Sequence, residues 1–122
     1  NSSTKLIGVT MLTSFDDKEI NEIGIDRNIE DNVNLLSNLA QSCELDGIVC
    51  SPHEISYIKK KFNLEVIAPG IRMKESQADD QKRTLTAKDA LIAGADVLVI
   101  GRPITQSDNP AEAARSIFDS IQ

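Results

Sequence analysis

The feature that most constrains the fold is a strand–helix pattern that repeats four times: an apolar segment typical of a strand, followed by an amphipathic segment typical of a helix. The expected strands are residues 5–12, 47–50, 65–68 and 96–100. Serial units of this kind predict parallel strands joined by right-handed crossovers. Two α/β architectures fit. One is an open doubly wound sheet, and the other is part of a (β/α)8 barrel, which takes ~250 residues when complete.

The periodic segments between the strands predict helices. They are expected over residues 16–23, 29–42, 52–62, 87–93 and 110–121. Ser51 with Glu54, and Asn109 with Glu112, have the spacing of helix-capping pairs. The first strand is apolar almost throughout rather than alternating, which predicts burial on both faces, as in parallel sheets.

Charge and composition exclude several classes of function. A net charge of −6 argues against nucleic-acid binding, which needs a basic surface. No apolar run is long enough to span a membrane. Cys43 and Cys50 match no metal-binding spacing and are expected to be reduced thiols of a cytoplasmic protein. The only histidine, His53, is expected to be exposed, so no metal site is predicted.

Candidate ligand-binding residues follow the strands, because parallel α/β proteins bind ligands beyond the C-terminal strand ends. Gly101 and Arg102 follow the fourth strand, where a glycine amide and a guanidinium suit a phosphate; a turn glycine beside a surface arginine is the alternative. Thr13 and Ser14 follow the first strand and either bind a ligand or cap the next helix, with capping preferred for Ser14. We find no nucleophile with a base, no close acid–base pair and no dinucleotide fingerprint.

Five sequence blocks, taken together and in order, resemble bacterial orotidine 5′-phosphate decarboxylases over essentially the whole chain. The blocks are residues 6–14, 45–51, 68–72, 80–83 and 99–105. The resemblance implies a homodimeric (β/α)8 barrel that converts orotidine 5′-monophosphate to UMP and CO2 without a metal or organic cofactor. It places this chain at the C-terminal half, strands five to eight with their helices, as a single unit.

The resemblance also implies a set of substrate-binding residues. They are Thr13, Ser14, Arg72, Gln81, Gly101 and Arg102. The first two lie at the pyrimidine and ribose end, and the last two hold the phosphate through a backbone N–H and a guanidinium. Arg72 and Gln81 belong to a mobile loop, about residues 70–85, that closes over the substrate, with Gln81 reaching the phosphate. Met73, Lys74, Glu75 and Asp79 depart from the family pattern in that loop.

The largest departure is that the family's catalytic Asp-x-Lys-x-x-Asp motif is not in this sequence. We therefore expect no catalytic residue in this chain and no activity from it alone. It should associate with itself or with the N-terminal half of the same enzyme, because half a barrel exposes two strand edges. The absence of Met at position 1 fits a piece of a longer protein, or equally processing. The alternatives are a flavodoxin-like phosphate-binding module and a related sugar-phosphate decarboxylase or epimerase barrel.

Overall fold

The computed structural model describes residues 3–11, 13–72 and 85–122, and within them one parallel sheet. Its strands are β1 (Ile7–Val9), β2 (Gly47–Val49), β3 (Glu65–Ala68) and β4 (Val97–Leu98). They lie side by side in chain order, β1-β2-β3-β4. A complete doubly wound sheet reverses its strand order at a switch point, whereas a barrel wall is sequential. The order therefore supports the expected half-barrel over the flavodoxin-like alternative.

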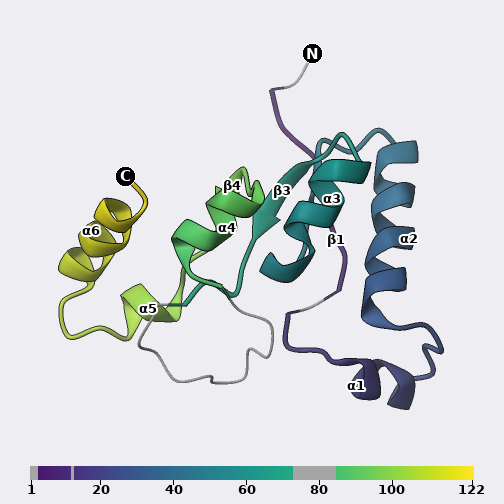
Figure 1. The fold of residues 1–122 in the computed structure, drawn as a ribbon, viewed down its shortest axis with the longest axis horizontal. Helices are drawn as coiled ribbons and strands as arrows, with labels where there is room; N and C mark the ends of the chain where they lie inside the picture. The colour runs from purple at the N-terminus through teal and green to yellow at the C-terminus, as the bar shows by residue number, and fades with distance from the viewer. Residues whose placement is uncertain (1–2, 12, 73–84) are drawn as a thin grey trace.

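Helical segments follow each strand. They are α1 (Asp17–Glu22), α2 (Ile29–Ser42), η1 (Pro52–Glu54), α3 (Ile55–Lys61), α4 (Ala87–Ala93), α5 (Arg102–Thr105) and α6 (Pro110–Ser120). Figure 1 shows α2, α3, α4 and α6 in chain order along the sheet, with α1 and α5 at the same end of it. No helix in the described ranges is both long and apolar enough to cross a membrane.

The two faces of the sheet are covered differently. On the helix-covered face, Ile48, Val66 and Ala68 are fully buried. The opposite face, here called the open face, carries a row of register neighbours with one residue from each strand: Val9, Val49, Ile67 and Val97. At the two ends of this row, Val9 is 61% exposed and Val97 is 47% exposed. The prediction that the first strand is buried on both faces is therefore wrong, because no second layer lies over the open face in the part of the chain described.

The residues that cap α1 and η1 correct one prediction, for Ser14, and confirm another, for Ser51 with Glu54. Asp16, not Ser14, caps α1, since its side chain accepts from the Glu19 amide at 2.9 Å while the Glu19 carboxylate accepts from the Asp16 amide. The aspartate stands next to the helix and its charge suits the helix N-terminus. Ser51 and Glu54 form the predicted capping box, with the Ser51 amide donating to Glu54 Oε2 at 2.9 Å.

An ion pair and a backbone hydrogen bond, both made by Asp96, join the N-terminal ends of β3 and β4. Asp96, just before β4, accepts from the Val66 amide at 2.7 Å and from Lys59 Nζ at 2.9 Å. Partial burial works to raise the pKa of Asp96. The Val66 hydrogen bond, the Lys59 hydrogen bond and the Lys59 charge outweigh it and hold this pKa below its usual value. Asp96 thus ties β4 to β3 and to α3.

We expect Asp96→Asn to lower the free energy of unfolding at neutral pH, with a difference from the unaltered chain that depends on pH. A carboxyl whose pKa is lowered by folding stabilises the protein above its unfolded pKa, near 3.8, and loses that contribution as the pH falls through the folded value. The gap between the two proteins should therefore close below about pH 3.8. Urea unfolding at several pH values in the acid range measures this difference in the free energy of unfolding. Asp119→Asn, an exposed position on α6, is the control. A difference that does not change with pH would contradict the lowered pKa of Asp96.

Candidate functional site

The loops after β3 and β4 begin side by side. The pairing Ala68↔Leu98 is extended by the Val99 amide, which donates to the Ala68 carbonyl at 2.9 Å. Beyond β3, Ile71 bridges to Leu85, and the Arg72 amide donates to the Leu85 carbonyl at 3.0 Å. These bonds set the end of β3 beside the segment that leaves β4, and they hold the backbone of Arg72 against Leu85.

Gly101 and Arg102 open α5, a short helix that the sequence analysis missed. The Gly101 carbonyl accepts from the amides of Ile104 and Thr105 at 2.9 and 3.0 Å. The Gly101 amide makes no hydrogen bond to another described residue, and a Cβ at this position would meet nothing within 4 Å. The amide is therefore accessible to a ligand. Pro103, in the first turn, was the sequence signal for a helix start here.

A hollow of about 260 Å³ connects the two loops on the helix side. Its lining residues are Ile71, Arg72, Thr86, Ala87, Lys88, Asp89, Ile100, Pro103, Ile117 and Ser120. Arg72 Nη1 donates to the Ile71 carbonyl at 3.4 Å, which keeps the guanidinium close to its own backbone. Lys88 and Asp89 were not singled out in the sequence, because the Thr86 cap fully explained their pattern.

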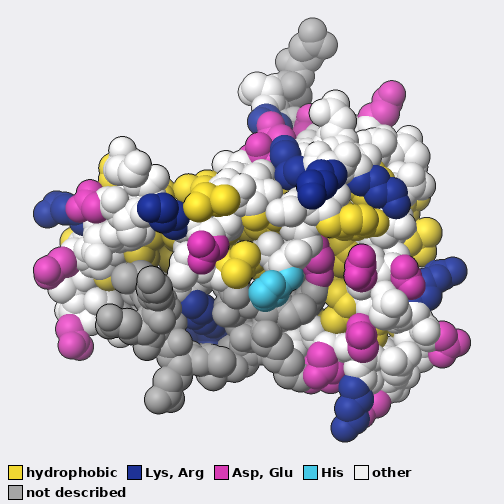
Figure 2. Space-filling view, viewed as in Figure 1, with side chains coloured by type: hydrophobic (Ala, Val, Ile, Leu, Met, Phe, Trp, Pro, Cys, Tyr) yellow, Lys and Arg dark blue, Asp and Glu magenta, His cyan; other side chains and the backbone are white. Residues whose placement is uncertain are grey.

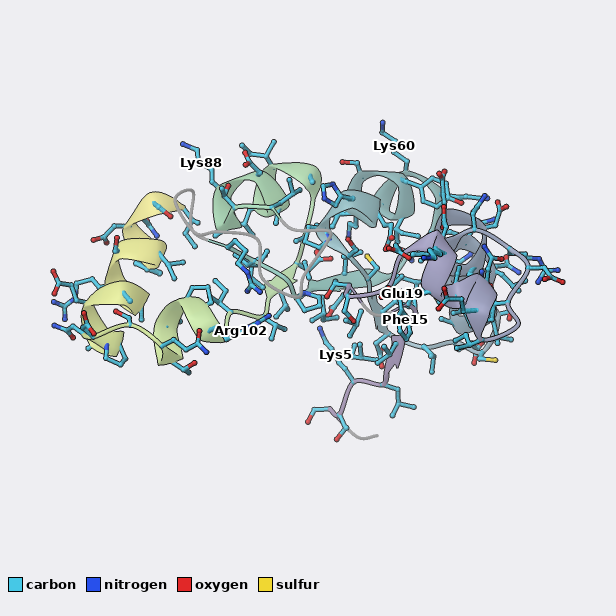
Figure 3. The ribbon with its side chains drawn as sticks, turned by 90° about the horizontal axis from the view of Figure 1, so that it is seen from below. Lys5, Phe15, Glu19, Lys60, Lys88 and Arg102 are labelled. Atoms are coloured by element: carbon cyan, nitrogen blue, oxygen red, sulfur yellow. The ribbon has the colours of Figure 1, made fainter. Side chains whose placement is uncertain are left out.

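Thr13 and Ser14 lie at the other side of the sheet, in the turn after β1. Thr13 is 7% exposed and Ser14 is half-buried. Figure 3, seen from the end that carries α1 and α5, shows Phe15 close to this turn and Arg102 well to the other side. β1 and β4 are three strand spacings apart, roughly 14 Å along the sheet. The structure thus places Arg72 in one hollow with Ile100 and Pro103, the residues on either side of Gly101 and Arg102, and leaves Thr13 and Ser14 apart. Gln81 and most of the predicted loop lie outside the described residues.

A second hollow, of about 480 Å³, lies beside α1 and η1 rather than at the arginines. Its lining is Asp16, Asp17, Asn28, Ile29, Glu30, His53, Glu54 and Tyr57. Figure 2 shows the acidic side chains gathered over α1 and the start of α2. Carboxylates repel a phosphate. The region beyond the C-terminal ends of the strands therefore has an acidic side at α1 and a basic side at Arg72 and Arg102. An anion binds more favourably on the basic side. Among the residues that the structure describes, no group of three side chains is arranged to hold a metal ion.

Comparison with known proteins yields one consistent family. The family model for orotidine 5′-phosphate decarboxylase / HUMPS matches residues 1–117. The orotidine 5′-phosphate decarboxylase of Ehrlichia canis is 48% identical over 122 residues, which cover 98% of this chain and 53% of the relative. That of Actinobacillus succinogenes is 47% identical over 118 residues, 95% of this chain and 51% of the relative.

Solved structures agree with the sequence relatives. The crystal structure of orotidine 5′-phosphate decarboxylase from Lactobacillus acidophilus superposes with a TM-score of 0.78 at 31% identity, covering 99% of this chain and 50% of that one. The crystal structure of orotidine 5′-phosphate decarboxylase from Pyrococcus horikoshii superposes with a TM-score of 0.67 at 29% identity. The match covers 96% of this chain and 50% of that one. The chain thus spans about half the length of the relatives it matches, which confirms the predicted half-barrel. The chain belongs to the orotidine 5′-phosphate decarboxylase / HUMPS family.

Proposed function

We propose that this chain is the phosphate-binding half of an orotidine 5′-monophosphate decarboxylase, which forms UMP and CO2 without a cofactor. The observation that carries the proposal is the 48% identity, over 98% of the chain, to a relative named for this activity. In the proposed complex, the Gly101 amide and the Arg102 guanidinium bind the phosphate and Arg72 lies beside them. Thr13 and Ser14 contact the pyrimidine and ribose end.

The separation of these two groups of residues suits the reaction proposed. A nucleotide that reaches both sides of the sheet is held at its phosphate, far from the ring whose carboxylate is lost. Binding energy from such a remote group can be used to hold the reacting end in place, which accelerates the reaction rather than merely tightening binding. The acidic residues near Asp16 and Asp17 discourage the reversed orientation.

The proposal assigns no catalytic residue to this chain. Residues 1–122 contain no Asp-x-Lys-x-x-Asp motif, so the groups that act on the carboxylate must come from an N-terminal half. That half would supply the four remaining strands of the barrel, and the complete enzyme would act in the cytoplasm, as a homodimer. The chain alone should bind nucleotide weakly and catalyse nothing.

The test is to complete the enzyme. The chain is joined behind the N-terminal half of the Ehrlichia canis relative, and the loss of orotidine 5′-monophosphate is followed by its ultraviolet absorbance. We expect decarboxylation by the joined protein and none by either half alone. A joined protein that folds, as judged by circular dichroism, yet leaves this substrate unchanged would overturn the proposal.

A further inference from the structure

The turn that carries Thr13 and Ser14 lies between two points at which the chain is attached to the rest of the fold. The point before the turn is Thr10, just after β1. Its amide and its Oγ1 both donate to the Val49 carbonyl of β2, at 3.1 and 2.7 Å. The point after the turn is α1, which begins at Asp17. The position of the turn therefore depends on how firmly α1 is held.

Apolar packing holds α1 on the core. Ile20 is fully buried, and Phe15, just before the helix, is partly buried against the core. With six residues, α1 is too short to be stable by itself, so it depends on such contacts. The hydrophobic effect has no preferred direction, and burial alone therefore leaves the helix free to rotate or slide. A directional bond is needed to fix where α1 begins, and with it the turn.

Asp17 makes such a bond. Its Oδ1 accepts from the Ile29 amide at 2.7 Å, from a residue twelve positions further along the chain. Ile29 is the first residue of α2, so its amide has no carbonyl partner within that helix. The negative charge of Asp17 also suits the N-terminus of α2. Asp17 therefore joins the first residue of α1 to the first residue of α2, beyond the end of β1 (Figure 1).

The bond made by Asp17 differs from the capping bonds around it. Each carboxylate of the Asp16–Glu19 pair accepts from the other residue's amide, and these two bonds close the N-terminal end of α1. Asn28 caps α2 locally, since its side chain accepts from the Asp31 amide at 2.7 Å. These bonds form the ends of the helices, whereas the bond of Asp17 sets one helix against the other.

We propose that Asp17 is a positioning residue for the pyrimidine and ribose end of the substrate. By fixing the start of α1 against α2, it holds Thr13 and Ser14 in the place where they contact the nucleoside. The inference rests on the proposed function and adds to it a residue that acts through the turn. A turn that is already held in place need not be ordered when the ligand binds, which favours affinity. The phosphate end follows β3 and β4 and does not depend on this bond.

Asp17→Ala in the joined enzyme tests the inference with two ligands that report the two ends of the site separately. Uridine has the ring and the ribose but no phosphate. We expect it to bind about three- to tenfold more weakly, which is the net contribution of one hydrogen bond. Inorganic phosphate reports only the phosphate end, and its affinity should be unchanged. Isothermal titration of each ligand measures both affinities.

Two further variants separate the hydrogen bond from the charge. Asp17→Asn removes the charge but keeps an Oδ1 that can accept from the Ile29 amide, so we expect it to bind uridine nearly as well as the unaltered enzyme. Asp31→Ala removes an exposed carboxylate from the first turn of α2 and should change neither affinity. Uridine binding as weak in Asp17→Asn as in Asp17→Ala would assign the effect to charge and overturn the proposed role of the bond.

The outcomes distinguish this inference from the proposed function. Unchanged uridine affinity in Asp17→Ala would overturn the inference. Equal weakening of uridine and inorganic phosphate would overturn it too, because that result indicates a general loosening of the fold. Either result, in a joined enzyme that decarboxylates orotidine 5′-monophosphate, leaves the proposed function standing. An unaltered joined enzyme that neither binds uridine nor acts on that substrate would overturn the proposed function, and this inference with it.

Discussion

Arg102→Ala in the joined enzyme should weaken UMP binding at least tenfold and leave uridine binding unchanged. A charge-assisted hydrogen bond contributes roughly 1.5–3 kcal/mol, and each 1.4 kcal/mol is about a factor of ten in affinity. The phosphate is the group that UMP has and uridine lacks, so the difference between the two ligands isolates the contact. Isothermal titration of both nucleotides measures it.

Two further variants make this test specific. Arg115→Ala removes an exposed arginine of α6 and should change neither affinity. Arg102→Lys keeps the charge but loses the planar fork, so it should recover only part of the loss. Equal weakening of UMP and uridine would indicate a general disturbance of the fold. Unchanged UMP affinity would remove Arg102 from the proposed phosphate site.

The periodicity of the sequence predicted the elements because each has a local cause. The helix over residues 29–42 was predicted to the residue, since Ile29, Val33 and Ala40 recur on one buried face. The left-handed Gly94, φ 109°, ends α4 as expected. β3 has the predicted bounds, 65–68, whereas the other three strands are shorter than predicted, because an apolar run continues beyond the last ladder hydrogen bond. β4, for example, covers only Val97–Leu98 of the predicted 96–100.

Two features could not be predicted from the sequence: whether the same chain covers both faces of a strand, and which of two nearby residues caps a helix. The apolar pattern of residues 5–12 reports a strand that some structure must cover, but it cannot say whether the same chain does so. Ser14 and Asp16 are both good cap residues, and only the backbone path decides between them. α5 was missed because four residues are too few to show a helical period.

The candidate site, too, could be predicted from the sequence only in part. That Arg72 lies near the segment after β4 was predictable, since β3 and β4 are adjacent parallel strands. The acidic hollow beside α1 was not, because its carboxylates come from three segments, near Asp16, Glu30 and Glu54, that only the fold brings together. The charge division between this hollow and the arginines is therefore a property of the tertiary structure.

Gly47→Ala should be among the most destabilising single-methyl additions in the sheet. Gly47 lies in β2 between β1 and β3, and a Cβ there would stand 2.6 Å from the Glu65 carbonyl oxygen and 2.9 Å from Glu65 Cβ. Backbone atoms cannot move aside as a side-chain terminus can, so relief requires β2 and β3 to separate. Overpacking of this kind costs about 1–3 kcal/mol or more. Urea unfolding of the variant, followed by circular dichroism, gives the loss.

Gly8→Ala, one strand away, separates this clash from the general effect of replacing glycine. Both variants restrict the unfolded chain equally, which by itself stabilises by roughly 0.4–1 kcal/mol. The one tight contact of a Cβ at Gly8 would be Leu45 Cδ1, at 3.0 Å, the end of a flexible side chain that can rotate away. Its other neighbours, Ala40 Cβ and Ile48 Cγ2, lie at ordinary distances of 3.9 and 4.0 Å. Gly8→Ala should therefore stay within about 1 kcal/mol of the unaltered chain. If the two variants were equally stable, β2 and β3 could not be packed as closely as the register Gly47↔Glu65 requires.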